Sequence, residues 1–169
     1  MIVKNHDPTW LQMFEAEKLA ISLALGDNVR AIHHIGSTAI PNIVAKPIID
    51  ILAVASELDL IDSRSAQMQP LDYEAMGEFG ISGRRYFRKQ NAAGIRTHHV
   101  HVYAVGNSEV QRHLDFRDYL IAHPAIAAEY SQLKLRLVEE SRRIGTNYQE
   151  GKSEFIQRIQ QLAALWRQA

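Results

Sequence analysis

The sequence predicts an α+β domain in which a mixed β-sheet flanked by helices precedes a helical C-terminal part. A helical pattern opens the chain, strand-like segments follow to about residue 106, and helical periodicity alone continues from there. Strands followed by a block of helices are typical of α+β architecture. The chain has 169 residues, the size of one domain with its own core. We therefore expect a single domain over 1–169, with the sheet in about 1–106 and the helices in about 107–169.

The strand-like segments differ in how clearly they are marked. Asp7 and Pro8 are an N-cap and first-turn pair, and they open a helix that reaches residue 25. Residues 47–54 are almost continuously apolar and rich in isoleucine, as in a strand buried on both faces. Residues 97–105 alternate with period two. The other elements that we expect in this part are strands at 29–35, 74–79 and 84–88 and a helix at 56–68.

Three helices are expected in the C-terminal part, at 108–123, 124–143 and 147–167. Ser108 to Gln111 reads as a capping box, and Pro124 separates the first helix from the second. Apolar and aromatic side chains recur at helical spacing, which indicates core packing. Polar side chains that could line a groove between these helices and the sheet are Arg112, Arg117, Asp118, Tyr148 and Lys152.

The composition excludes several classes of function. Nineteen basic residues balance nineteen acidic ones, so no global positive field favours general nucleic-acid binding. The chain has no cysteine, which removes disulfides, thiolate metal ligands and cysteine nucleophiles. Residues 1–7 contain no apolar signal-peptide core, and no run reaches membrane-spanning length. We expect a cytoplasmic protein with no membrane partner, and the sequence leaves its oligomeric state open.

The most informative residues are a Gly-Ser turn and a carboxylate. Gly36 and Ser37 leave the predicted strand 29–35, and Asp50 lies in the apolar strand that follows. Glycine lets the backbone approach a ligand closely, and a turn of N–H groups beside a hydroxyl binds phosphate oxygens. An ionised Asp50 among isoleucines needs a cation nearby, which is either a metal ion or a basic side chain. His34 precedes the turn and is expected to buttress it.

Histidines on the predicted strand 97–105 are candidate partners for Asp50. His99 and His101 share one face of that strand, and His98 points to the other. Imidazole suits Zn²⁺ or Mn²⁺ better than Mg²⁺, and it also binds phosphate or moves a proton. We therefore place His101 with Asp50 as catalytic candidates and His99, His101 and Asp50 as metal candidates. Plain hydrogen-bonded wall residues are the alternative reading of these histidines.

Basic side chains offer candidate phosphate contacts. Arg84 and Arg85 belong to the one basic cluster of the sequence, with glycines on its N-terminal side, and guanidinium groups clamp terminal phosphates well. A solvated hairpin explains the same charges without any function. Lys46 stands just before the Asp50 strand, as a phosphate contact or as a surface position.

Residues 34–41 and 45–51 closely resemble the bacterial GrpB family, and the resemblance continues through 77–87, 96–102, 112–120 and 148–155. This family is grouped with nucleotidyltransferases of the DNA polymerase β type. The resemblance implies that Gly36 and Ser37 match the superfamily's Gly-Ser signature and that Asp50 matches its first metal carboxylate. Leu52 stands where the second carboxylate belongs, and the third has only His99 or His101 as a polar match.

The resemblance implies a nucleotidyltransferase-like fold that binds a nucleotide or another phosphorylated small molecule with a divalent metal, Mg²⁺ first and Mn²⁺ or Zn²⁺ as alternatives. Nucleotidyl transfer to an acceptor is the activity that it suggests. Because one carboxylate is too few for two-metal chemistry, two alternatives remain beside it. One is a nucleotide-binding or regulatory module without catalysis. The other is a metal-dependent phosphoesterase built on histidine and aspartate.

Overall fold

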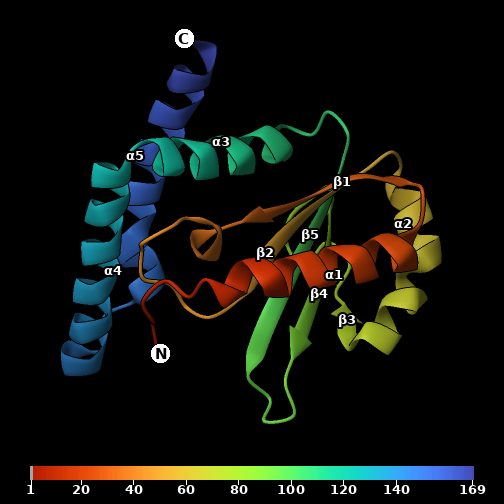
Figure 1. The fold of residues 1–169 in the computed structure, drawn as a ribbon, viewed down its shortest axis with the longest axis horizontal. Helices are drawn as coiled ribbons and strands as arrows, with labels where there is room; N and C mark the ends of the chain where they lie inside the picture. The colour runs from red at the N-terminus through yellow and green to blue at the C-terminus, as the bar shows by residue number, and fades with distance from the viewer. Residues whose placement is uncertain (1) are drawn as a thin grey trace.

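The computed structural model describes residues 2–169 and contains a five-stranded sheet with helices on both faces (Figure 1). The strand order is β1-β2-β5-β4-β3. The central strands β2 and β5 are parallel, and every other neighbouring pair is antiparallel. The sheet is therefore mixed, as the sequence predicts. Its strands are β1 (Val29–Ile35), β2 (Ile49–Ala55), β3 (Tyr73–Ala75), β4 (Arg84–Gln90) and β5 (Arg96–Ala104).

One face of the sheet carries the main hydrophobic core. Helix α1 (Thr9–Leu25) crosses this face, beside the short helix α2 (Leu58–Arg64) and the 3₁₀ segment η2 (Ser65–Leu71) (Figure 1). Alternation along β2 turns Ile49, Ile51, Ala53 and Ala55 into this core. Removing these side chains from water is the dominant stabilising term of such a layer.

The opposite face of the sheet packs against α3 (Ser108–Ala122). Leu52 and Val54 of β2 lie in this second cluster, together with Tyr103 of β5 and Leu114 of α3. Since Asp50 has the same parity in β2 as Leu52, its side chain also faces α3. The sheet thus places its one central carboxylate on the side that the C-terminal helices cover.

Helices α4 (Pro124–Ile144) and α5 (Tyr148–Gln168) stand beside the sheet and lie against each other and against α3 (Figure 1). A Cβ on Gly151 of α5 would collide with the side chain of Leu137 in α4. Glycine at this position therefore lets the two helices approach closely. Lys134 of α4 and Lys152 of α5 line the same cavity beside Asp50 of β2.

Most predicted elements are confirmed, and the differences have local causes. The expected helix at 56–68 begins only at Leu58 and changes to 3₁₀ geometry at Ser65, with Pro70 inside it. The expected strand at 74–79 ends at Ala75, because Gly77, Phe79 and Gly80 adopt positive φ angles.

The expected capping box at Ser108 is wrong, because Asn107 caps α3 through a hydrogen bond from the Glu109 N–H. The three C-terminal helices themselves are confirmed. Within residues 2–169, no helix combines the length and the hydropathy needed to cross a membrane.

Candidate functional site

The Gly-Ser turn sits directly against Asp50. Gly36 has φ +73°, and a Cβ built on it would lie 2.8 Å from Asp50 Oδ2. Only glycine therefore allows the backbone and the carboxylate to approach this closely. The turn is buttressed from below, as the sequence predicts, because His34 Nε2 lies 2.9 Å from Thr38 Oγ1 and its ring stacks on Phe14. Ser37 opens the short 3₁₀ segment η1 (Ser37–Ala39).

Two histidines of β5 converge on one oxygen of Asp50. His99 Nδ1 lies 3.3 Å and His101 Nε2 lies 3.5 Å from Asp50 Oδ1. Arg84 Nη1 lies 3.3 Å from His101 Nδ1. Because a guanidinium can only donate, this contact leaves the His101 proton on Nε2, where it faces the carboxylate. The structure therefore joins the two strands through a close Asp-His-His cluster.

The charge of Asp50 is stabilised by these neighbours. Burial alone would raise the pKa of Asp50, but hydrogen bonds from His101 and His99 hold the pKa of this carboxyl well below its ordinary value. Asp50 is thus an anion at neutral pH and keeps a 30% exposed side chain. Residues 2–169 nevertheless contain no group of three or more acidic or histidine side chains arranged to hold a metal ion.

A cavity of about 200 Å³ opens beside Asp50 and is lined by lysines from three parts of the chain. Lys46 comes from the segment before β2, Lys134 from α4 and Lys152 from α5. We call this space the lysine cavity. It holds more positive than negative charge, since Asp50 is the only carboxylate in its lining. Its other lining residues are Ser37, Thr38, Ile48, His99, Tyr148 and Gln149.

Lys134 is the most unusual residue of this cavity. It is only 2% exposed, and its Nζ has no hydrogen-bond partner among the described residues. Its one close neighbour of note is the ring of Tyr130, 4.4 Å from Nζ to the centroid. Burial, with a smaller effect of Lys152, lowers the pKa of Lys134 to about 7. A buried ammonium without a partner is costly, and an anion beside it would offset that cost.

The other two lysines are held by Tyr148. Lys46 Nζ and Lys152 Nζ lie 4.9 Å and 4.7 Å from the centroid of its ring, and Tyr148 is 3% exposed. Such cation–π contacts fix the ammonium groups while leaving their N–H donors free for a ligand. Burial lowers the pKa of Lys152 to about 8, and the nearby Lys46 adds to this effect. The amines of three lysines thus surround one small space.

The predicted site residues separate into two sets. The structure brings together Gly36, Ser37, Asp50, His99, His101 and Lys46 where β1 ends and β2 begins, beside β5. Arg84 contacts this set only through His101, and its other donors go to the carbonyl oxygens of Glu78 and Phe79. Arg85 lies on the opposite face of the sheet, where Asp62 of α2 accepts from its Nε at 2.6 Å. The structure does not bring Arg85 near the turn.

Sequence reasoning missed Lys134, and it proposed Lys152 only as a groove residue. Lys134 stands four residues after Tyr130 and three before Leu137, within a stripe of buried positions on α4. A lysine that interrupts an apolar stripe is the signal that was available. The position of its amine depends on how α4 packs against the segment before β2, which local sequence does not determine.

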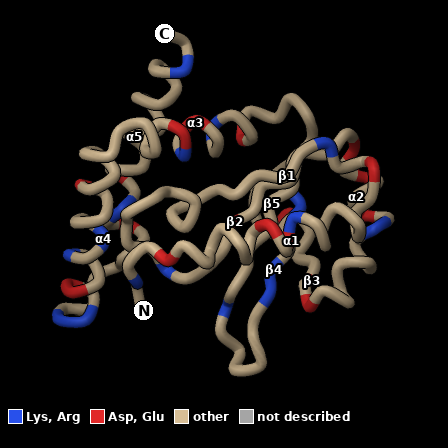
Figure 2. The backbone as a smooth tube through the Cα atoms, viewed as in Figure 1, with Lys and Arg blue, Asp and Glu red and all other residues tan. Residues whose placement is uncertain are grey.

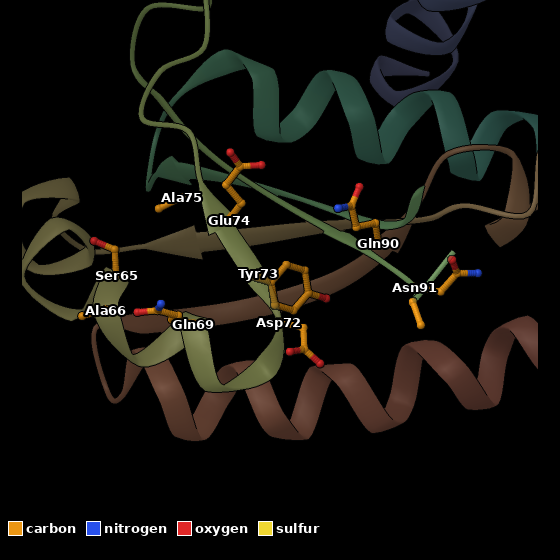
Figure 3. A pocket seen from close by; sticks show the side chains of 10 residues that line it. Ser65, Ala66, Gln69, Asp72, Tyr73, Glu74, Ala75, Gln90 and Asn91 are labelled. Atoms are coloured by element: carbon orange, nitrogen blue, oxygen red, sulfur yellow. The ribbon is translucent and has the colours of Figure 1, made fainter. Parts of the chain in front are cut away.

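A larger hollow of about 810 Å³ lies elsewhere, at the free edge of β3 (Figure 3). Figure 3 shows its side chains spread along η2, β3 and the strand ends rather than converging on one point. Its lining contains carboxylates and amides and no basic residue. It does not include Asp50 or the turn, so we assign the candidate site to the lysine cavity. The lining of the hollow is Ser65, Ala66, Gln69, Asp72, Tyr73, Glu74, Ala75, Gln90, Asn91 and Ala92.

Known proteins resemble this chain over nearly its whole length. The model of the family described as GrpB protein matches residues 1–162. UPF0157 protein YqkA of Bacillus subtilis is 44% identical over 96% of the chain, which spans only 47% of YqkA. Glutamate-rich protein GrpB of Alkalihalophilus pseudofirmus is 33% identical, with 94% of this chain and 93% of that protein covered.

Solved structures place the fold in a wider group. The crystal structure of conserved protein GrpB from Enterococcus faecalis superposes with a TM-score of 0.93 at 41% identity, covering 99% of this chain and all of that one. The Cid1 poly(U) polymerase superposes with a TM-score of 0.54 at 11% identity, over 83% of this chain and 43% of Cid1. The second similarity concerns the fold alone, which is nucleotidyltransferase-like. The family match and the close relatives identify the chain as a member of the GrpB protein family.

Proposed function

We propose that the protein binds the phosphate groups of a nucleoside triphosphate, or of a related phosphorylated ligand, in the lysine cavity. One observation carries the proposal: Lys134 Nζ is buried without a partner at a cavity that also receives Lys46 and Lys152. An anion is the ligand that offsets this charge, and a polyphosphate is the common small anion with enough charge to engage several lysines.

The Gly-Ser turn supports the same conclusion from the opposite wall. Ser37 lines the lysine cavity, and its side chain lies close enough to Tyr130 to lower the pKa of that phenol against the effect of burial. A hydroxyl held at a turn beside three ammonium groups is a suitable contact for phosphate oxygens. Structural neighbours make a nucleotide the first ligand to test, because Cid1 has been solved with the UTP analogue UMPNPP and a trypanosomal terminal uridylyl transferase with dUTP.

The side chains beside Asp50 do not fit a two-magnesium centre. Such a centre needs several carboxylates, and the position two residues after Asp50 is Leu52, which is fully buried in an apolar cluster. The residue opposite Leu52 on the neighbouring strand β5 is His101, and imidazole is a poor ligand for Mg²⁺. Binding is therefore the function that the geometry supports best, and nucleotidyl transfer by two metal ions is not.

A single divalent ion remains compatible with this donor set. Mg²⁺ is commonly bound by one or two carboxylates together with the phosphates of a substrate, so Asp50 would hold the ion and the ligand would complete its shell. The phosphoesterase alternative requires His99 and His101 to ligate a metal. Both imidazoles instead direct a nitrogen at Asp50 Oδ1. We propose one ion, Mg²⁺ first and Mn²⁺ or Zn²⁺ as alternatives, that arrives with the phosphates.

The test is calorimetric titration with ATP, GTP, CTP and UTP, each with Mg²⁺, Mn²⁺, Zn²⁺ or EDTA, on wild type and Asp50→Asn. The proposal predicts metal-assisted binding in wild type. In EDTA, Asp50→Asn should bind the nucleotide at least as tightly as wild type, because the only carboxylate of the cavity has lost its charge. The assistance by metal should be lost in this variant. Absence of nucleotide binding under all conditions would contradict the proposal.

Turnover is measured in the same samples as release of pyrophosphate, and p-nitrophenyl phosphate hydrolysis tests the esterase alternative. Binding without release of pyrophosphate is the result expected for a module that has one carboxylate. Steady release that Asp50→Asn abolishes would establish a transferase or hydrolase instead.

A further inference from the structure

A second cavity, of about 270 Å³, adjoins the lysine cavity. The two share Ser37, Asp50 and Lys152, so the turn and the carboxylate stand on the border between them. We call it the α3–α5 cavity, since most of its remaining walls come from those helices. Its other lining residues are Ile35, Gly36, His101, Arg112, His113, Phe116, Tyr130, Ile156 and Gln160.

The α3–α5 cavity differs sharply from the lysine cavity in charge. Its only guanidinium, that of Arg112, is paired with the carboxylate of Glu109 one turn earlier in α3. Apart from this pair and the border residues, the walls are aromatic, aliphatic or uncharged polar groups. Phe116 packs edge-on against Tyr130, with ring centroids 6.1 Å apart. The space therefore suits an uncharged group with a flat ring.

We propose that one ligand spans both cavities, with its polyphosphate in the lysine cavity and an uncharged, ring-bearing group of nucleoside size in the α3–α5 cavity. This inference rests on the proposed phosphate site and adds the chemistry of the rest of the ligand. Small-molecule pockets usually exceed roughly 300 Å³, so a space of about 270 Å³ holds a group below typical drug size, such as a base with its sugar.

The aromatic ring of the ligand has no comparable place in the lysine cavity. Besides the His99 imidazole, Tyr148 is the aromatic residue there, but Lys46 and Lys152 lie against its ring and it is almost fully buried. A ring stacking on Tyr148 would have to displace an ammonium group. In the α3–α5 cavity, Phe116 and Gln160 keep intermediate exposure and are accessible to a ligand. The amide of Gln160 can both donate to and accept from a base edge.

The same charges argue against a polynucleotide in this space. A strand would bring several phosphates into a cavity whose one arginine is already neutralised by Glu109. Basic and acidic positions are interspersed along α3, α4 and α5 (Figure 2). A single nucleotide would instead place all of its phosphate charge in the lysine cavity.

The experiment compares inorganic tripolyphosphate with ATP, GTP, CTP and UTP by calorimetry, on wild type, Gln160→Trp and Gln161→Trp. The first variant fills the α3–α5 cavity from α5. The second is the matched control, because Gln161 is the exposed neighbour of Gln160. The inference predicts that at least one nucleotide binds wild type and Gln161→Trp about tenfold or more tightly than tripolyphosphate does. Gln160→Trp should remove that advantage and leave tripolyphosphate affinity within about twofold of wild type.

Three results would overturn the inference. If every nucleotide binds wild type no better than tripolyphosphate, the group beyond the phosphates makes no contact, and the lysine cavity alone stands. If Gln160→Trp leaves the nucleotide advantage intact, or weakens both ligands equally, the second cavity does not bind the ring. If neither tripolyphosphate nor any nucleotide binds, the proposed phosphate site fails as well. Gln160→Ala, which removes only the amide, gives the same comparison should the tryptophan variant be unstable.

Discussion

Gly36 and Asp50 are in contact: no side chain fits between the turn and the carboxylate, because a Cβ on Gly36 would lie 2.8 Å from Asp50 Oδ2. The turn and the strand carboxylate are therefore one unit, and a change in either moves the other. The φ angle of +73° adds backbone strain for any residue with a side chain.

We expect Gly36→Ala to lower the free energy of unfolding by about 1–3 kcal/mol and to abolish nucleotide binding. Gly94→Ala is the matched control, because Gly94 has φ +76° but nothing within 4 Å of its Cβ position. The control should show the backbone strain alone, with nucleotide affinity unchanged. Urea denaturation and calorimetry measure the two quantities. Normal binding by a folded Gly36→Ala protein would show that the close approach is not needed.

Leu52 stands where a second metal-binding carboxylate would be expected, but we predict that it serves the core. It is fully buried with Ile35, Val54 and Tyr103. Leu52→Asp should destabilise the fold by about 3 kcal/mol or more, since it removes apolar contacts and buries a carboxylate. Leu52→Met, which keeps the volume, should cost less than about 1.5 kcal/mol. Urea denaturation measures both, and a stable Leu52→Asp protein with metal-dependent transfer activity would contradict this account.

The sequence predicts those parts of the site that arise from local sequence patterns. Gly36, Ser37 and Asp50 are recognisable because a turn and an apolar strand are local patterns. The pairing of Asp50 with His99 also follows from strand alternation once β2 and β5 are neighbours. Arg85 is separated from the site because alternate residues of β4 face opposite sides of the sheet, and sequence alone does not say which face meets the turn.

The lysine cavity could not be predicted without the packing of the C-terminal helices. Lysine is rarely buried, so the apolar stripe around Lys134 was the one sequence sign of its burial. That it lines a cavity depends on where α4, α5 and the segment before β2 meet. The border of η2 was likewise missed, since the switch from α to 3₁₀ geometry at Ser65 depends on packing near Pro70 and on contacts with β3.

The burial of Lys134 predicts an unusual pH dependence of stability. Its pKa is about 7 in the folded protein and near 10.5 in the unfolded chain. Between these values the unfolded chain binds a proton that the folded protein does not, so stability rises with pH. This one group should contribute up to about 1.4 kcal/mol per pH unit in that window. Lys152 adds a slope of the same sign from about pH 8.

Lys134→Met isolates this contribution. Relative to wild type, the variant should be most stabilised at pH 6, where the buried charge costs most, and the advantage should shrink steadily from pH 7 to pH 9. Chemical denaturation without phosphate or other multivalent anions measures the difference. A difference that does not change with pH would mean that Lys134 keeps its charge in the folded protein.

The contact of α4 with α5 gives a packing prediction. Gly151→Ala places a methyl group against Leu137, and we expect a loss of about 1–3 kcal/mol from overpacking. Leu137→Ala alone should also destabilise, because it leaves a cavity. The double variant should be more stable than the sum of the two effects, since each change makes room for the other. Strict additivity in a double-mutant cycle would show that the helices adjust elsewhere.

The central claim is that buried Lys134 and its neighbours form a phosphate-binding site, and direct titration with tripolyphosphate tests it. We would measure wild type, Lys134→Met and Arg136→Met at pH 6.5. Arg136→Met is the matched control, because Arg136 is an exposed residue of the same helix. The account predicts binding to wild type and Arg136→Met and a loss of about tenfold or more in Lys134→Met. Equal affinity in the two variants would contradict it, as would the absence of binding to wild type.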